Sequence, residues 1–281
     1  MHNSDDLLFW EQQRGLIRSR KGGWIVGKGV YCHHYSLMDE LIGRVSYVRV
    51  MVLNATGRLP GKRLGNWFEA SLLCTSWPDA RIWCNQIGAF GGTVRVSPAA
   101  ATMAGTLAAD SMAYGVQTIV QSQQFIQQAL AARRGGQTIQ EIVEAEFKRK
   151  LGKGYVTGYS RPIASGDLRL PAMERIRKRL GFAMQAHLRL AFKIGRYLDA
   201  HHGEQINTAG YLAAFLADRG YSTQEVYRIY ASMVSSGVLA CFADTDDRPA
   251  EAFLPLRCVD VQYTGKPRRV VPECVDEGGR S

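Results

Sequence analysis

The stretch "GKGYVTGYSRPIASGDLRLPAM", residues 152–173, interrupts two strongly helical segments with a loop rich in glycine and arginine. It places Arg161, Asp167 and Arg169 close together in sequence. A connector needs only a few polar residues, whereas guanidinium groups grouped in this way suit an anion. The loop therefore predicts an anion-binding site between helices.

The segments on both sides of this loop carry helix signals. "TIQEIVEAEFKRKLGKG", residues 138–154, begins with a Thr/Glu capping box and ends in basic residues and glycine. Pro171 is expected to start a long amphipathic helix that runs to Ala200, and a second capping box lies at 222–225. Further helices are expected over 41–52 and 66–77. Two or three consecutive helices are expected over 98–134, which Gly105 and Gly115 interrupt. Residues 22–31 are expected to be extended or a turn, and 258–264 a short strand. The sequence thus predicts an all-α protein with few short strands.

The composition of the 281 residues limits the possible classes of protein. Hydrophobic residues make up 46% and charged residues 21%, which is ordinary for a globular chain. No uninterrupted apolar run approaches the length of a membrane span, and the N-terminus lacks the order of a signal peptide, so we expect a cytoplasmic protein without membrane attachment. Six cysteines without a C-x-x-C pair argue against a metal site.

A formal charge of +10 first suggests nucleic acid as a partner. The chain nevertheless shows no zinc-finger spacing, no RNP-like strand and no basic region before heptads. A small polyanionic ligand, or solubility alone, accounts for the charge equally well. We therefore expect no nucleic-acid partner.

Five segments in order resemble the citrate synthase superfamily, which includes the citryl-CoA lyases. These segments are "ELIGRVSYVRVMVLNATGRLP" (40–60), "SPAAATMAGTLAADSMAYG" (97–115), "TGYSRPIASGDLR" (157–169), "NTAGYLAAFLADRG" (207–220) and "LPLRCVDVQYTGKPRRVVP" (254–272). The resemblance implies a large helical dimerisation domain (1–114 and 233–281) and a smaller helical domain (115–232) that closes over the ligand. It also implies a homodimer with shared sites, for which we expect the alanine-rich segment 98–130 to form the interface.

The chain departs from the family at the positions that carry its chemistry. By the resemblance, Tyr114 and Ser160 stand where two catalytic histidines are expected, and Ala209 stands in place of the catalytic aspartate. Alanine cannot act as a base. The candidates for a base are Asp110 and the His33–His34 pair. Asp110 is preferred, because it would lie one helical turn before Tyr114.

The anion-binding residues of the family are retained. The resemblance assigns Arg169 to a substrate carboxylate and Arg257 to the same ligand from the other subunit. Asp167 would orient the loop, and Arg161 would face a CoA phosphate or solvent.

Two functions remain open at this point. One is an acyltransferase or carbon–carbon lyase that joins or separates an acyl-CoA, with the CoA thioester as co-substrate, and an oxoacid-like small carboxylate. Its chemistry would be altered and it would lack ordinary citrate synthase activity. The other is a non-catalytic ligand sensor or partner subunit with the same fold.

Overall fold

The computed structural model describes residues 4–15, 17–150, 155–160, 166–250 and 258–270. Its first elements are α1 (Ser4–Gln13), the strands β1 (Gly22–Ile25), β2 (Gly29–Cys32) and β3 (Tyr35–Ser36), and a π-helical turn, η1 (Leu37–Leu41). The helices that follow are α2 (Tyr47–Thr56), α3 (Lys62–Thr75), α4 (Trp83–Thr93), α5 (Pro98–Ala108), α6 (Val116–Arg134), α7 (Ile139–Arg149), α8 (Arg169–Arg179), α9 (Ala186–His202), α10 (Thr208–Asp218), α11 (Thr223–Tyr230) and α12 (Ser235–Asp246), and a short 3₁₀ turn, η2 (Cys258–Asp260), comes last. The expected all-α class is confirmed.

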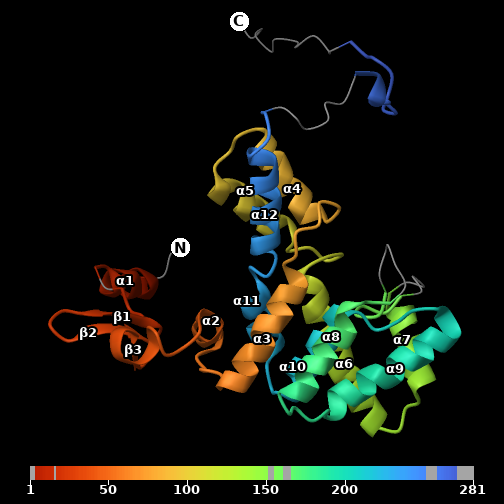
Figure 1. The fold of residues 1–281 in the computed structure, drawn as a ribbon, viewed down its shortest axis with the longest axis horizontal. Helices are drawn as coiled ribbons and strands as arrows, with labels where there is room; N and C mark the ends of the chain where they lie inside the picture. Colours follow the sequence, from red (N-terminus) through yellow and green to blue (C-terminus); the bar gives the residue numbers. More distant parts are fainter. Residues whose placement is uncertain (1–3, 16, 151–154, 161–165, 251–257, 271–281) are drawn as a thin grey trace, which may run out of the picture.

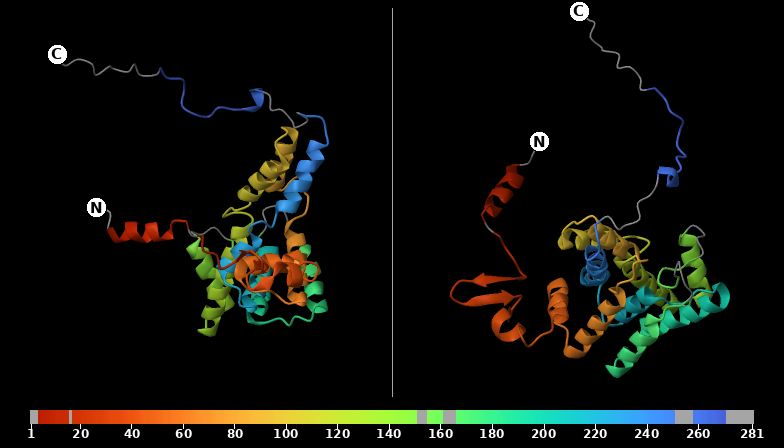
Figure 2. Two further views of the ribbon diagram at one scale, coloured as in Figure 1. Left: turned by 90° about the vertical axis from the view of Figure 1, so that its left-hand side faces the viewer. Right: turned by 45° about the horizontal axis from the view of Figure 1, so that its top comes forward.

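Figure 1 shows these elements in three groups. The strands form a small antiparallel sheet in the order β1-β2-β3, beside α1 and next to α2. Helices α4, α5 and α12 pack side by side, and α6 to α10 form a larger group. Both views of Figure 2 show α4, α5 and α12 lying together. Residues 258–270 lead away from the helices.

Helix α10 is the centre of the larger group. Eight consecutive residues, Gly210 to Ala217, are buried, and the sequence "GYLAAFLA" is apolar on all sides, which is the pattern of a fully enclosed helix. It packs against α6 and α9. The Phe215 ring stacks on Trp67 of α3 with centroids 3.9 Å apart, so the core joins helices that are distant in sequence.

Glycines allow the α4–α5–α12 group to pack closely. A Cβ on Gly105 would lie 2.6 Å from Val238 Cγ1, and a Cβ on Gly88 would lie 2.5 Å from the Val238 carbonyl oxygen. Val238 of α12 therefore sits between α4 and α5 at a distance that only glycine permits. Within the alanine-rich segment, Ala101 and Gly105 are the buried small residues of α5 that serve this packing.

The structure corrects two of the expected elements. The helix expected from Pro171 to Ala200 is two helices, α8 and α9, because Gly181 adopts a left-handed φ of 68° and breaks the chain direction. Residues 258–264 contain the η2 turn and not a strand. The expectation of consecutive helices over 98–134 is confirmed by α5 and α6, which are separated at Gly115.

Helices α11 and α12 together meet a length and composition test for a membrane span. The segment Thr223–Asp246 has a mean hydropathy of 1.3 over its most apolar window, and half of that window is buried inside the protein. Because α12 packs against α4 and α5, this apolar character is that of a core helix pair.

Candidate functional site

Asp167 is the centre of a hydrogen-bond network that joins the loop to α10. Its Oδ2 accepts from the Thr208 backbone N–H at 2.9 Å and from the Thr208 hydroxyl at 2.7 Å, at the first residue of α10. The same carboxylate accepts from Arg169 through Nε at 2.8 Å and Nη2 at 2.7 Å. Negative charge at a helix N-terminus is favourable, so this carboxylate stabilises α10 and fixes Arg169 at once.

The ionised form of Asp167 is strongly favoured by its partners. Burial, which leaves only 1% of the side chain exposed, would by itself raise the pKa. The hydrogen bonds from Arg169 and Thr208 and the charge of Arg169 outweigh burial and lower the pKa of Asp167 to about 2. The expectation that Asp167 orients the loop fits this geometry.

Arg169 is held in place but keeps donors to spare. Beyond its two bonds to Asp167, its Nη1 donates to the Cys74 carbonyl oxygen at 3.0 Å. A guanidinium has five N–H groups, and these bonds use three of them. One N–H on each of Nη1 and Nη2 has no acceptor in the part of the chain that the structure describes, and 30% of the side chain is exposed. These two N–H groups are therefore available to a further acceptor, such as a carboxylate oxygen.

The loop before Arg169 is pinned to the start of α10 by the backbone. Asn207 donates from its side-chain amide to the Ser160 carbonyl at 2.8 Å, and from its backbone N–H to the Gly158 carbonyl at 2.9 Å. Gly158 has a φ of 95°, and a Cβ on Gly210 would lie 2.3 Å from the Gly158 oxygen. Ser160 is therefore placed next to α10 by two glycines packed backbone to backbone.

Tyr114 and Cys84 form a second polar pair near Arg169. The Tyr114 hydroxyl and the Cys84 Sγ are 3.2 Å apart, and the Tyr114 ring lies 5.5 Å from that of Trp83. Burial, with the Cys84 contact adding to it, raises the pKa of Tyr114 far above its ordinary value, whereas the charge of Arg169 acts weakly in the opposite direction. The phenol thus stays protonated at neutral pH and can only donate to an incoming oxygen.

Comparisons with known proteins give one consistent result. No protein-family model matches the chain, and no curated protein sequence matches it. Among solved structures, the citryl-CoA lyase from Hydrogenobacter thermophilus has a TM-score of 0.75 at 21% identity, over 92% of this chain and 98% of that one. The ATP citrate lyase from Methanothrix soehngenii, in complex with citrate and coenzyme A, has a TM-score of 0.70 at 15% identity, over 94% of this chain and 46% of that one.

The citrate synthase from Thermotoga maritima MSB8 has a TM-score of 0.62 at 13% identity, over 81% of this chain and 60% of that one. The chain has the citrate synthase fold. This confirms the fold expected from the sequence resemblance. Because the sequence identities are low, the roles of single residues are argued from the geometry of this chain alone.

Within this citrate synthase fold, the structure contradicts the expected place of Asp110. Helix α5 ends at Ala108, and Asp110 forms an isolated β-bridge with Gly115, so Asp110 and Tyr114 do not share a helical face. The carboxylate of Asp110 accepts from the Tyr227 hydroxyl at 2.6 Å and from the Gln117 amide at 2.8 Å. It links α11 to the start of α6, which is a structural position.

Two of the expected site residues cannot be placed, and two unexpected residues belong to the site. Arg161 and Arg257 lie outside the described residues. Cys74 and Thr208 belong to the site but were not expected, since nothing in the sequence links position 74 to a loop some ninety residues later. Among the described residues, no cluster of three or more His, Cys, Asp or Glu is placed to hold a metal ion.

Proposed function

We propose that this chain binds a CoA thioester and a small carboxylate and makes or breaks a carbon–carbon bond between them. Structures with the same fold support this choice: the Methanothrix enzyme holds citrate and coenzyme A, and a Thermoplasma acidophilum citrate synthase holds carboxymethyl coenzyme A and oxaloacetate. The observation that carries the proposal is the Arg169 guanidinium, fixed by Asp167 and Cys74 with an N–H on each Nη left to donate.

The site residues suit particular parts of such a reaction. Arg169 holds a carboxylate of the oxoacid-like substrate with two charge-assisted hydrogen bonds. Tyr114, protonated and close to Arg169, donates its O–H to the carbonyl oxygen on which negative charge develops when the carbon–carbon bond forms or breaks. Ser160, pinned beside α10, supplies a second hydroxyl at the loop.

The chemistry differs from that of an ordinary citrate synthase in its base. Ala209 has no proton acceptor, the thiol of Cys84 is held protonated because burial raises its pKa, and Asp110 is engaged by two hydrogen bonds away from Tyr114. We therefore expect no appreciable condensation of acetyl-CoA with oxaloacetate. A thiol-release assay with a turnover on the order of 10 per second would overturn this expectation.

We also propose that the protein is a cytoplasmic homodimer. Large apolar side chains are exposed on the α4–α5–α12 group, namely Trp83 (58%), Phe90 (49%), Met103 (52%), Leu107 (75%) and Leu239 (45%). A monomer rarely leaves so many together in water, and a second copy would cover them. The sequence resemblance would have Arg257, which lies outside the described residues, contribute to the site of the partner subunit.

The second candidate function is a non-catalytic ligand sensor or partner subunit. The observation that favours it is the engaged carboxylate of Asp110 together with the alanine at position 209, because they leave the described site without a positioned base. Both functions require the ligand contact at Arg169, and only the first requires turnover.

Calorimetric titration of the full chain with citrate, oxaloacetate and CoA, singly and in pairs, tests the proposal. Arg169→Ala should weaken binding of the carboxylate by about ten- to a hundred-fold, since a charged hydrogen-bond donor typically contributes roughly 1.5–3 kcal/mol. Arg175→Ala, an exposed arginine two turns further along α8, should leave binding unchanged. Equal binding by the parent and Arg169→Ala would refute the site, and binding without cleavage of citryl-CoA would favour the sensor.

A further inference from the structure

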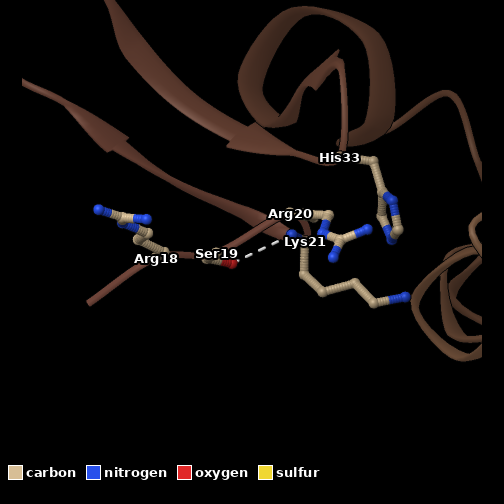
Figure 3. Close-up of a pocket in the computed structure, with 5 residues that line it drawn as sticks. All are labelled: Arg18, Ser19, Arg20, Lys21 and His33. Atoms are coloured by element: carbon tan, nitrogen blue, oxygen red, sulfur yellow. Dashed lines mark hydrogen bonds between the residues drawn. The ribbon is translucent and has the colours of Figure 1, made fainter. Parts of the chain in front are cut away.

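The N-terminal region contains a cavity that the proposed active site does not use. It has a volume of about 560 Å³ and is lined by Arg18, Ser19, Arg20, Lys21 and His33. Figure 3 shows that the side chains of Arg20, Lys21 and His33 converge on one side of the segment, while Arg18 extends the other way. Three nitrogen-bearing groups from the start of β1 and the end of β2 therefore face the same space.

The positive charges in this cavity are not balanced by the protein. No acidic residue is among those that line it, and the described residues record no ion pair for Arg18, Arg20 or Lys21. Lys21 donates from Nζ to the Asn54 carbonyl oxygen at 3.2 Å, which leaves two of its three donors. Like charges brought together in this way repel one another, and an anion between them removes the repulsion.

His33 adds an unsatisfied polar atom to the same cavity. Its Nε2 is buried and has no hydrogen-bond partner, and its backbone has a left-handed φ of 53°, which is uncommon for a residue with a side chain. Burial, helped by the charges of Lys21 and His34, lowers the pKa of His33 and so favours the neutral ring. The residue therefore contributes an unsatisfied polar atom at the edge of the basic cluster.

A second cavity of about 420 Å³ continues the basic region toward α11. Lys21 lines both cavities, and the second one adds Arg228 with Met51, Asn54 and Ala55. Arg228 is exposed, and the described residues record no ion pair for it. The cationic side chains are thus distributed over two adjoining cavities that share Lys21. They extend over a larger area than a single carboxylate group would contact.

We propose that these two cavities bind a small anion with adjacent phosphate groups, such as a diphosphate. The tetrahedral oxygens of a diphosphate can reach several separate point charges, and lysine commonly binds phosphate in this way. Four cationic side chains line the two cavities, and three of them, Arg20, Lys21 and Arg228, remain when Arg18, which extends the other way, is left aside. The diphosphate charge of about −3 at neutral pH matches these three, and each volume lies in the range of small-ligand sites. The proposal does not depend on the function assigned above, because Arg169, Tyr114 and Asp167 line neither cavity.

Titration calorimetry of the full chain with inorganic pyrophosphate, at about 0.1 M salt, tests this site. The double variant Arg20→Gln/Lys21→Gln should weaken binding at least about tenfold. The matched control is Lys193→Gln/Arg196→Gln, which removes the same charge from exposed positions on α9 and should change binding less than about twofold. Equal loss in both double variants, or no saturable heat in the parent, would overturn the proposal, and circular dichroism with a melting curve checks that every variant is folded.

Competition identifies the source of the phosphates. Displacement of pyrophosphate by ATP, but not by CoA, assigns the site to a free nucleotide, whereas displacement by CoA assigns it to the phosphates of that molecule. Arg169→Ala should bind pyrophosphate as the parent does, so failure of the carboxylate site and failure of this site give different results. A duplex oligonucleotide that binds more tightly than pyrophosphate, and is weakened equally by both double variants, would instead mean a broad electrostatic surface.

Discussion

Replacement of Asp167 by asparagine should destabilise the fold and loosen Arg169 in one step. The carboxylate accepts hydrogen bonds at both oxygens: Oδ1 from the Arg169 N–H and Nε, and Oδ2 from Arg169 Nη2 and from the N–H and hydroxyl of Thr208. An amide offers one acceptor oxygen. If that oxygen takes the place of Oδ2, the amide NH₂ group faces two donors of Arg169 that it cannot satisfy.

The size of the effect follows from these bonds. Two hydrogen bonds to the charged carboxylate are lost, from the backbone N–H and from Nε of Arg169, each worth roughly 1.5–3 kcal/mol, although part of that is recovered when Arg169 turns toward solvent. The same bonds lower the pKa of Asp167 from 3.8 to about 2, which corresponds to roughly 2 kcal/mol in favour of the ionised carboxyl. We therefore expect Asp167→Asn to lower the free energy of unfolding by about 2–4 kcal/mol.

Urea unfolding at pH 7, followed by circular dichroism, measures this change as a lower midpoint with an unchanged slope. Asp244→Asn is the matched control, since Asp244 pairs with Arg248 at 2.6 Å but its side chain is 62% exposed, and exposed pairs contribute little. A loss below about 0.5 kcal/mol in Asp167→Asn, equal to that of the control, would refute the role given to this carboxylate.

Three further outcomes are expected. The pKa of Asp167 is lower in the folded than in the unfolded chain. The ionised carboxylate therefore stabilises the folded state fully above a pH of about 4, and this contribution is lost as the pH falls toward 2. In acid titrations, the difference in stability between the parent and Asp167→Asn should vanish over that window. Gly158→Ala should lower the melting temperature more than Gly136→Ala, because both glycines have φ near 95° but only at Gly158 would a Cβ meet other atoms, at 2.7 Å from Ser122 Oγ; equal losses would mean that the contact does not matter. Sedimentation should show a dimer that Leu107→Lys converts to a monomer, and a parent that sediments as a monomer at micromolar concentration would contradict the proposed assembly.

Local signals in the sequence predicted the helix boundaries that local interactions determine. Both capping boxes, at Thr138 and at Ser222, are present with their reciprocal hydrogen bonds. The break between α8 and α9 was missed because the apolar spacing continues across it. Distant contacts stabilise that break: Arg63 of α3 donates to the Leu180 carbonyl oxygen at 2.7 Å, 117 residues away in sequence. No periodicity in the segment itself could reveal this partner.

In the candidate site, too, the sequence predicted the neighbours that are close along the chain and missed the distant ones. The loop register placed Asp167 and Arg169 together because they are two residues apart, and the structure joins them by two hydrogen bonds. Cys74 and Cys84 were not predictable, since they reach Arg169 and Tyr114 only through the packing of α3 and α4. Asp110 was misplaced because helix α5 ends two residues before it, a boundary that the alanine-rich sequence does not mark.

The packing of Gly158 against Gly210 limits how this protein can change in evolution. A new side chain in a core is usually accommodated when a neighbouring side chain becomes smaller, but here each partner is bare backbone: a Cβ on Gly210 would meet the Gly158 oxygen at 2.3 Å, and a Cβ on Gly158 would meet the Gly210 Cα at 2.9 Å. No second substitution at either position can compensate for the first. Neither glycine can therefore be replaced by a residue with a side chain, and sequence variation around the loop has to occur at other positions.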